Sequence, residues 1–481
     1  MNRRPTESPI EIRTGLFAEF FSLAVRLGPF AILRGELEAE ETKEPDAEEV
    51  ADSTQPMLGW KNGDRLHGEI LKGNGEVITW KADSFRDPFS IRQKHLQEIK
   101  FPQLKKDSKK EDKPPANHFR FVLRNGDRIF GDLMSITAST VVLKSDRFPE
   151  NITLSRSEID RIEQVRGNRM RFAGPVDLDE WKTQGRNRKV DEWDTGLRGE
   201  FMTYQWHADI FRPIDFPNSV EINFAIETPG SVPNFEVSLV QKGENGPRVE
   251  TWGESLVLTH GANFAPILSM DPEQNEVQLR IFWNQSTGEL KACDATGRLL
   301  ASLEEVKVKF PAVGSSRRDS DEYLRGFSLI NRTPHIRLTH VNVREWNGED
   351  VPVIDINKPR IEMASGATYF GLNRLSLNNG SEKINVNGRD MTLDTVSEII
   401  FSTVSQSLDE QKIRNSTHIS WQDGSTISGK LVTLAGDRVV LNTDWNSKPV
   451  EAKLADAKQI LFPTGPNEEV PQLDQLKIGE V

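Results

Sequence analysis

The stretch Phe119-Arg-Phe-Val-Leu-Arg-Asn-Gly-Asp-Arg-Ile-Phe-Gly-Asp-Leu-Met134 decides the fold of this chain. Apolar side chains recur on both sides of the dipeptide Asn125-Gly126. Asn-Gly is typical of tight hairpin turns, because both central residues of such a turn take a positive φ. A second glycine, Gly131, opens the next apolar segment. The stretch therefore predicts short β-strands joined by a tight turn.

The same spacing of two glycines occurs again at residues 63–68, 366–371 and 424–429. Each unit closes about thirty residues after its second glycine in a strand-like segment that contains isoleucine, and repetition at a fixed spacing indicates a repeat architecture. The sequence thus predicts four repeat modules, of which the third is a divergent copy because its turn follows Ser365 and its middle has a different spacing. The modules cover residues 54–104, 116–166, 357–404 and 415–465.

A unit with such short strands must curl into a small barrel or pair with a neighbour to close its edges. The order of turn, second glycine and apolar triplet, as in Val439-Val440-Leu441, resembles the Sm-like and SH3-like small barrels. The resemblance to Sm-like proteins implies RNA binding through basic loops. In this chain the corresponding loops vary and the net charge is −12, which favours interaction modules and leaves RNA binding as an alternative.

The middle region, residues 167–348, loses the repeat and shows longer apolar alternation, as in Val220-Glu-Ile-Asn-Phe-Ala-Ile226. Long alternation without helical periodicity predicts an antiparallel two-sheet sandwich. The segments 219–226, 277–297 and 326–348 resemble the concanavalin A-like lectin and laminin-G type jelly roll. We therefore expect an all-β protein in which a central two-sheet jelly-roll sandwich is flanked by four small β-barrel-like repeats, two on each side.

The sandwich region carries no recognised catalytic motif. Glycoside hydrolysis needs two facing carboxylates, and hydrolases of the resembled fold often place them as Glu-x-Asp-x-Glu on one strand, a pattern that residues 167–348 lack. A Gly-x-Ser-x-Gly elbow and a complete phosphate-binding loop are also missing. We expect a non-enzymatic protein with no cofactor and no metal, because no spacing supports Asp271 or Asp294 as calcium ligands. A sugar-modifying hydrolase with an unrecognised carboxylate site stays open as the alternative.

Binding is the function that the sequence favours. Sugar sites on such sandwiches use exposed aromatic faces together with polar neighbours. Trp283 shares a face with core residues and Trp346 follows the last strand, whereas Tyr204, Trp206 and Trp252 are the candidates for a ligand-binding surface. The predicted function is binding or scaffolding, with a glycan or a protein as the partner of the sandwich and the repeats mediating further interactions. The oligomeric state stays open.

Composition sets further bounds. The chain has 481 residues, enough for several domains, and its acidity disfavours nucleic acid as a partner. The basic runs 105–113 and 161–171 are interpreted as solvated linkers. The single Cys293 excludes an internal disulfide.

The two ends of the chain differ from the rest. Residues 1–53 are expected to be an export signal or an amphipathic helix followed by an acidic linker, and residues 466–481 a tail. Glu19 and Arg26 interrupt the apolar run and disfavour a transmembrane segment. An exported, periplasmic or envelope location and a cytoplasmic location both stay open.

Overall fold

The computed structural model describes residues 55–102, 118–165, 169–183, 192–241, 246–308, 324–401 and 410–463. The predictions for residues 1–53, 105–113 and 466–481 lie outside this part of the chain. Among the described residues, no helix has both the length and the apolar character that crossing a bilayer requires. Strands dominate these residues, and α1 (Glu410–Arg414) is a single short turn of helix. The predicted all-β class is therefore confirmed.

Two antiparallel sheets form the middle region and enclose their own hydrophobic core. Val220, Ile222 and Phe224 of one strand face this core and are fully buried, as the alternation predicted. Trp181 packs edge-on against Phe201 with 5.4 Å between ring centroids. The eight-stranded sheet contains β12 (Met170–Gly174), β13 (Asp194–Thr195), β14 (Phe201–Thr203), β16 (Ser219–Glu227), β21 (Glu276–Asn284), β22 (Glu289–Cys293), β23 (Leu299–Leu303) and β25 (Ile336–Glu345). The six-stranded sheet contains β15 (Asp209–Pro213), β17 (Phe235–Gln241), β18 (Arg248–Trp252), β19 (Ser255–His260), β20 (Asn263–Ser269) and β24 (Leu324–Asn331).

Each repeat module is a small antiparallel ladder in the order fifth, first, second, third, fourth strand. The second strand is continuous in the second and fourth modules and broken in the first and third. The strands of the first two modules are β1 (Met57–Trp60), β2 (Arg65–His67), β3 (Glu69–Gly73), β4 (Val77–Lys81), β5 (Phe89–Arg92), β6 (Leu96–Lys100), β7 (His118–Leu123), β8 (Arg128–Ile136), β9 (Thr140–Lys144), β10 (Ile152–Ser155) and β11 (Ile159–Gln164). Those of the last two are β26 (Arg360–Met363), β27 (Thr368–Phe370), β28 (Leu375–Leu377), β29 (Lys383–Val386), β30 (Arg389–Thr392), β31 (Val396–Ile400), β32 (Thr417–Trp421), β33 (Thr426–Ala435), β34 (Arg438–Asn442), β35 (Val450–Lys453) and β36 (Ala457–Leu461).

Short 3-10 helices complete the elements. Three of them directly precede the fifth strand of the first, second and third modules, and two others lie in the sandwich and at the break in the third module. They are η1 (Gln93–His95), η2 (Arg156–Glu158), η3 (Leu178–Glu180), η4 (Leu372–Arg374) and η5 (Leu393–Thr395).

The repeat turn differs in type from the prediction. In the second module, the Gly126 N–H donates to the Leu123 carbonyl at 2.9 Å and the Leu123 N–H donates to the Asp127 carbonyl at 2.8 Å. Only the glycine takes a positive φ, +91° at Gly126, so this is a type I turn followed by a left-handed glycine. The Asn125 Oδ1 accepts the Asp127 N–H at 3.1 Å and so adds a side-chain bond to the same turn. The expectation of two positive-φ residues was wrong, but the same pair of backbone bonds recurs in all four modules, the divergent third one included.

The second glycine of the repeat permits a close approach of two strands. A Cβ atom at Gly131 would lie 2.5 Å from the carbonyl oxygen of Lys144, and backbone oxygens crowd Gly68 and Gly429 in the same way. Gly131→Ala is therefore expected to lower the free energy of unfolding by about 1–3 kcal/mol, the usual cost of overpacking. Chemical denaturation measures this loss. The control Ser135→Ala on the same strand is expected to change it by less than about 0.5 kcal/mol, and equal losses would contradict the crowding.

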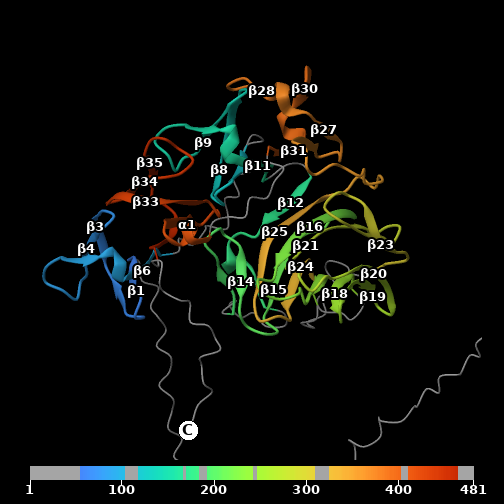
Figure 1. Ribbon diagram of the computed structural model, residues 1–481, viewed down its shortest axis with the longest axis horizontal. Coiled ribbons are helices and arrows are strands. Elements are labelled where there is room, and N and C mark those ends of the chain that lie inside the picture. The colour runs from blue at the N-terminus through green and yellow to red at the C-terminus, as the bar shows by residue number, and fades with distance from the viewer. Residues whose placement is uncertain are drawn as a thin grey trace, which may run out of the picture. The chain divides into compact units, whose positions relative to one another are not determined.

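The modules pair in a nested order, the first with the fourth and the second with the third (Figure 1). Their fifth strands run antiparallel, with Ile99 opposite Ile460 in one pair and Ile162 opposite Ile399 in the other. The ends of the second strands meet as well, β3 with β33 and β8 with β28. These contacts cover strand edges that would otherwise be open to further pairing. Modules that flank the sandwich in sequence thus come together in space.

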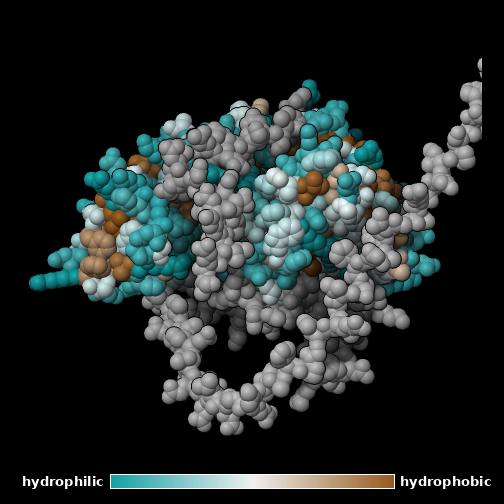
Figure 2. Space-filling view, turned by 60° about the horizontal axis from the view of Figure 1, so that its bottom comes forward, coloured by the Kyte–Doolittle hydropathy of each residue, from teal (hydrophilic) through white to brown (hydrophobic). Residues whose placement is uncertain are grey.

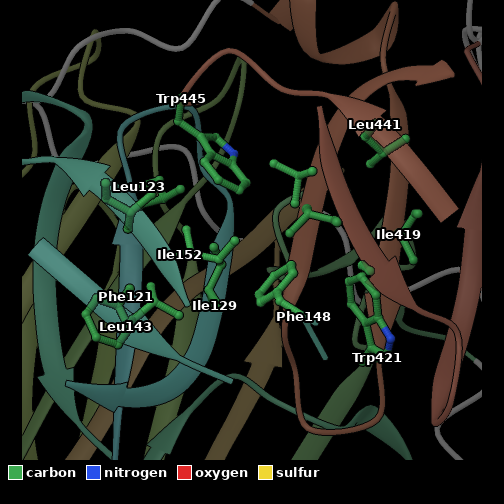
Figure 3. Packing of buried hydrophobic residues seen from close by; sticks show 14 of the residues in the cluster. Phe121, Leu123, Ile129, Leu143, Phe148, Ile152, Ile419, Trp421, Leu441 and Trp445 are labelled. Atoms are coloured by element: carbon green, nitrogen blue, oxygen red, sulfur yellow. The ribbon is translucent and has the colours of Figure 1, made fainter. Parts of the chain in front are cut away.

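One hydrophobic core is shared by all four modules. Figure 3 shows Phe148 of the second module beside Trp421 of the fourth. The Trp445 Nε1–H donates to the Asp127 carboxylate at 2.7 Å and so ties the fourth module to the turn of the second. Burial raises the pKa of Asp127 despite this bond. The repeats therefore form one packed body, in which a module does not depend on its own core alone.

Candidate functional site

A loop fixed by Asn331 carries two of the three predicted aromatic residues. The buried Asn331 side chain donates from Nδ2 to the Gln205 carbonyl at 2.8 Å, and the His207 N–H donates to the Asn331 carbonyl at 2.9 Å. His207 takes a φ of +60°, which residues other than glycine seldom adopt. These bonds hold the loop that carries Tyr204 and Trp206 in one conformation.

Tyr204 and Trp206 expose their rings to solvent. Trp206 is 58% exposed and Tyr204 is 40% exposed. The Tyr204 ring stacks on the His335 imidazole, with centroids 4.2 Å apart and planes inclined by 21°. A ring that is already backed by another ring presents a flat face without further ordering, and such faces suit stacking against a ligand.

Trp252, the third predicted residue, lies at the end of β18 and is 45% exposed. Its ring packs against Phe264 of β20 with centroids 5.1 Å apart, and Phe264 is itself 57% exposed. The sequence reasoning missed Phe264. The alternation of side chains through the β18–β19–β20 hairpins would have placed both rings on the outer face of the sheet.

Both aromatic groups border the same end of the six-stranded sheet. Asn331, which fixes the loop, is opposite Phe235 in the ladder, and the Phe235 N–H donates to Thr251 Oγ1 at 3.3 Å. Thr251 directly precedes Trp252. No ring contact joins Trp206 to Trp252 among the described residues, so the surface consists of two separate aromatic platforms.

Polar side chains lie along the strands near these platforms. Glu236 on β17 accepts a bond from Arg332 at 2.5 Å and lies 3.8 Å from Arg248. Its cross-strand neighbour Glu250 accepts a bond from Thr259 Oγ1 at 3.0 Å. This face therefore offers fixed carboxylate and guanidinium groups next to exposed rings, the combination that recognises hydroxyl-rich ligands.

The other tryptophans of the sandwich are buried. Trp181, Trp193, Trp283 and Trp346 are between 0 and 6% exposed. Figure 2 shows one face of the protein, on which hydrophilic side chains prevail and hydrophobic ones gather in small patches. The exposure of Trp206 and Trp252 thus contrasts with the burial of the other four tryptophans of the sandwich.

The outer face of the eight-stranded sheet is covered by the second and third modules, which meet it through ion pairs. Arg344 on β25 bonds to Glu221 on β16 at 2.6 Å, and Arg280 on β21 pairs with the same carboxylate at 2.9 Å. Arg344 also lies 3.6 Å from Glu362 of the third module. In the second module, Arg120 bonds to Glu163 at 2.5 Å with both side chains almost fully buried.

Two carboxylates of this interface have opposite pKa shifts. Burial alone would raise the pKa of Glu221, but Arg280 and Arg344 outweigh it and lower the pKa to about 2. At Glu398, burial together with the nearby carboxylates Glu163 and Glu362 raises the pKa to about 8, although Arg161 lies 3.6 Å away. Glu398 is therefore mostly protonated at neutral pH.

The interpretation of the run 161–171 as a solvated linker was wrong for the described residues that lie in β11 and β12, whereas residues 166–168 lie outside the described part of the chain. Arg161 lies in β11, its side chain is 26% exposed, and it pairs with Glu163 at 2.7 Å. The strand pairing of β11 with β31 draws this basic residue into the module interface. Sequence could not show this, because an alternating charge on a strand looks the same whether solvent or another module covers it.

Among the described residues, no three His, Cys, Asp or Glu side chains are grouped so that they could hold a metal ion. Asp294 instead accepts bonds from the Thr296 and Arg298 N–H groups within its turn, and Asp271 accepts the Glu273 N–H. Burial raises the pKa of Cys293 to about 11, so its thiol is not activated.

Neither a protein-family model nor a curated protein matches the sequence. Among solved structures, the chain is similar to arcelin-5, a lectin-like defence protein from Phaseolus vulgaris (12% identity, TM-score 0.23, 34% of this chain and 92% of that one). It is also similar to the binding domain of botulinum neurotoxin serotype D/C (9% identity, TM-score 0.23, 69% of this chain and 94% of that one). A third is a GH43 protein from Bacillus licheniformis (9% identity, TM-score 0.27, 59% of this chain and 68% of that one). TM-scores this low carry no functional conclusion.

Proposed function

We propose that this chain is a non-catalytic binding protein that recognises a glycan through the exposed aromatic surface at the end of the six-stranded sheet. The observation that carries the proposal is the exposure of Trp206 and Trp252 beside a fixed polar network, in a sandwich whose other tryptophans are buried. Aromatic rings stack on the apolar faces of sugar rings, and charged groups accept or donate bonds to the hydroxyls. The module body serves as the scaffold that presents this surface.

The ordered conformation of its loop supports this role for Trp206. Exposed tryptophan on a mobile loop would lose entropy on binding, but the bonds of Asn331 fix this loop beforehand. The contact of Trp252 with Phe264 restricts the second platform in the same way. Both platforms are therefore ordered without a ligand.

The experiment is a glycan array probed with the intact chain, followed by product analysis on every glycan that is retained. We expect saturable binding of at least one glycan class and no cleavage products after prolonged incubation. Failure to retain any glycan would contradict it. Retention followed by cleavage would replace binding with hydrolysis as the function.

The second candidate function, glycoside hydrolysis, is favoured by one observation. Glu398 with a raised pKa lies among carboxylates with lowered pKa, including Glu362, and an acid and a base with separated pKa values are what such catalysis needs. Against it, Glu362 pairs with Arg360 at 2.9 Å and is not free to act on a substrate. Binding without hydrolysis is therefore the function we propose.

A further inference from the structure

The interface between the second and third modules and the eight-stranded sheet contains a cavity of about 380 Å³. Small-molecule sites commonly have volumes of about 300–1,000 Å³. Arg124 and Arg128 of the second module, Asn223 of β16 and Glu398 of β31 contribute to its wall. The cavity is thus built by all three parts and lies on the other sheet from the aromatic surface.

Two arginines of this wall form no direct ion pair with a carboxylate among the described residues. Arg128 is 8% exposed, and its guanidinium donates to the carbonyl oxygens of Gly199 at 3.3 Å and Thr339 at 3.2 Å. Burial, reinforced by the charge of Arg120, lowers the pKa of Arg128 to about 9. The Nε–H of Arg124 is buried and has no hydrogen-bond partner. Arg124 as a whole is half-buried, and the carboxylates of Glu200 and Glu163 offset only part of the lowering of the Arg128 pKa. An anion in the cavity would give both guanidinium groups a direct partner.

The other ionisable groups leave the cavity positive. Six arginines and five acidic residues line it. Two of the acids, Glu398 and Glu276, have raised pKa values, in both cases first because of burial. His340 contributes no charge, because burial lowers its pKa to about 3. At neutral pH the arginine charge therefore exceeds the carboxylate charge.

Two buried acceptors beside the arginines also lack partners. Asn223 and Asn342 are opposite each other on β16 and β25, and the Oδ1 atoms of both are buried without a hydrogen bond. Asn342 is 8% exposed and lines a small adjoining space of about 20 Å³, in which Asn223 also takes part. Hydroxyl groups or water are the donors that such oxygens require.

We propose that this cavity binds a small hydroxylated organic anion, whose anionic group pairs with Arg124 and Arg128 and whose hydroxyls donate toward Asn223 and Asn342. A sugar acid and a sugar phosphate share this chemistry. Arginine forks bind carboxylate and phosphate oxygens in pairs, which gives the site both its charge preference and its orientation. The site is independent of the glycan surface proposed above.

Isothermal titration of the intact chain at pH 7 tests the site with D-glucuronate, glucose 6-phosphate and glucose. Saturable one-to-one binding is expected for at least one of the two anions, and the one that binds more tightly distinguishes carboxylate from phosphate. Glucose is expected to bind at least tenfold more weakly. Equal binding of glucose, or no saturable binding of either anion, would overturn the proposal.

Variants locate the binding. Arg124→Gln is expected to lower the affinity for the anion at least tenfold. Asn223→Ala, which leaves the arginines in place, is a second variant that is expected to lower this affinity. The matched control is Arg156→Gln, which makes the same exchange at an arginine of the same module that lies outside the cavity and bonds to backbone carbonyls. Trp206→Ala should leave anion binding unchanged, which separates this site from the aromatic surface. Unchanged affinity in both Arg124→Gln and Asn223→Ala would overturn the assignment.

Discussion

Arg120→Met is expected to lower the free energy of unfolding by about 3–5 kcal/mol, the usual cost of removing one partner of a buried ion pair. Arg120 is 2% exposed, and its Nε lies 2.5 Å from Glu163, which is 1% exposed. Methionine fills most of the space but leaves the Glu163 carboxylate with Arg161 and without its buried partner. Urea denaturation followed by tryptophan fluorescence measures the loss.

The control for this prediction is an exposed pair. Arg298 lies 3.1 Å from Asp294 and is 70% exposed, so Arg298→Met is expected to cost less than about 1 kcal/mol. A loss at Arg120 as small as the loss at Arg298 would show that solvent reaches the Arg120–Glu163 pair. The burial of the second module's outer strands at the interface with the sandwich would then be wrong at this point.

The free energy of unfolding of the native protein is expected to fall as the pH rises from about 5 to about 8, and Glu398→Gln is expected to abolish this fall. The folded-state pKa of Glu398 is raised to about 8 from an ordinary value of 4.5, so between these values the folded state binds a proton that the unfolded state has released. The free energy of unfolding of the native chain therefore falls as the pH rises through this window. A tenfold change in proton affinity corresponds to about 1.4 kcal/mol. Because the burial of Glu398 is incomplete, we expect the free energy of unfolding of the variant to exceed that of the native chain by about 2–4 kcal/mol at the alkaline end of this window.

Denaturation at pH 5, 6.5, 8 and 9 measures this difference. The exposed Glu382 of the third module supplies the control, since Glu382→Gln should leave the pH dependence as it is in the native chain. Parallel stability curves for the native chain and Glu398→Gln would contradict the protonated state of Glu398. The same result would also weaken the case for a positive cavity at neutral pH.

Local signals in the sequence predicted the all-β class and the repeat turns. The turn glycine takes a positive φ in every copy, and the second glycine permits close strand approach in the first, second and fourth modules. In the third module Gly371 instead takes a positive φ of +76° before η4. The nested pairing could not be predicted, because the fifth strands around Ile99, Ile162, Ile399 and Ile460 carry the same pattern. Any two of them could pair, and the choice depends on contacts made across the whole chain.

The candidate sites likewise include residues that the sequence predicted and residues that it did not. Exposure of Tyr204, Trp206 and Trp252 agrees with the sequence expectation, while their role in binding stays a prediction. Phe264 was missed although strand alternation marks its face. The charged cavity left no sequence signal, because Asn223 on its wall alternates with core residues along β16 as a solvent-facing residue would, and the covering modules enclose it.

The most direct test of glycan recognition is a titration of the best-retained glycan against the native chain and two variants, Trp206→Ala and Trp252→Ala. At least one variant is expected to bind about tenfold more weakly, which corresponds to about 1.4 kcal/mol. The control is Phe85→Ala, an exposed ring that contacts Phe89 in the first module much as Trp252 contacts Phe264. Weakened binding by the tryptophan variants with unchanged binding by Phe85→Ala is the predicted result. Equal affinity in all four proteins would contradict the aromatic surface as the glycan site.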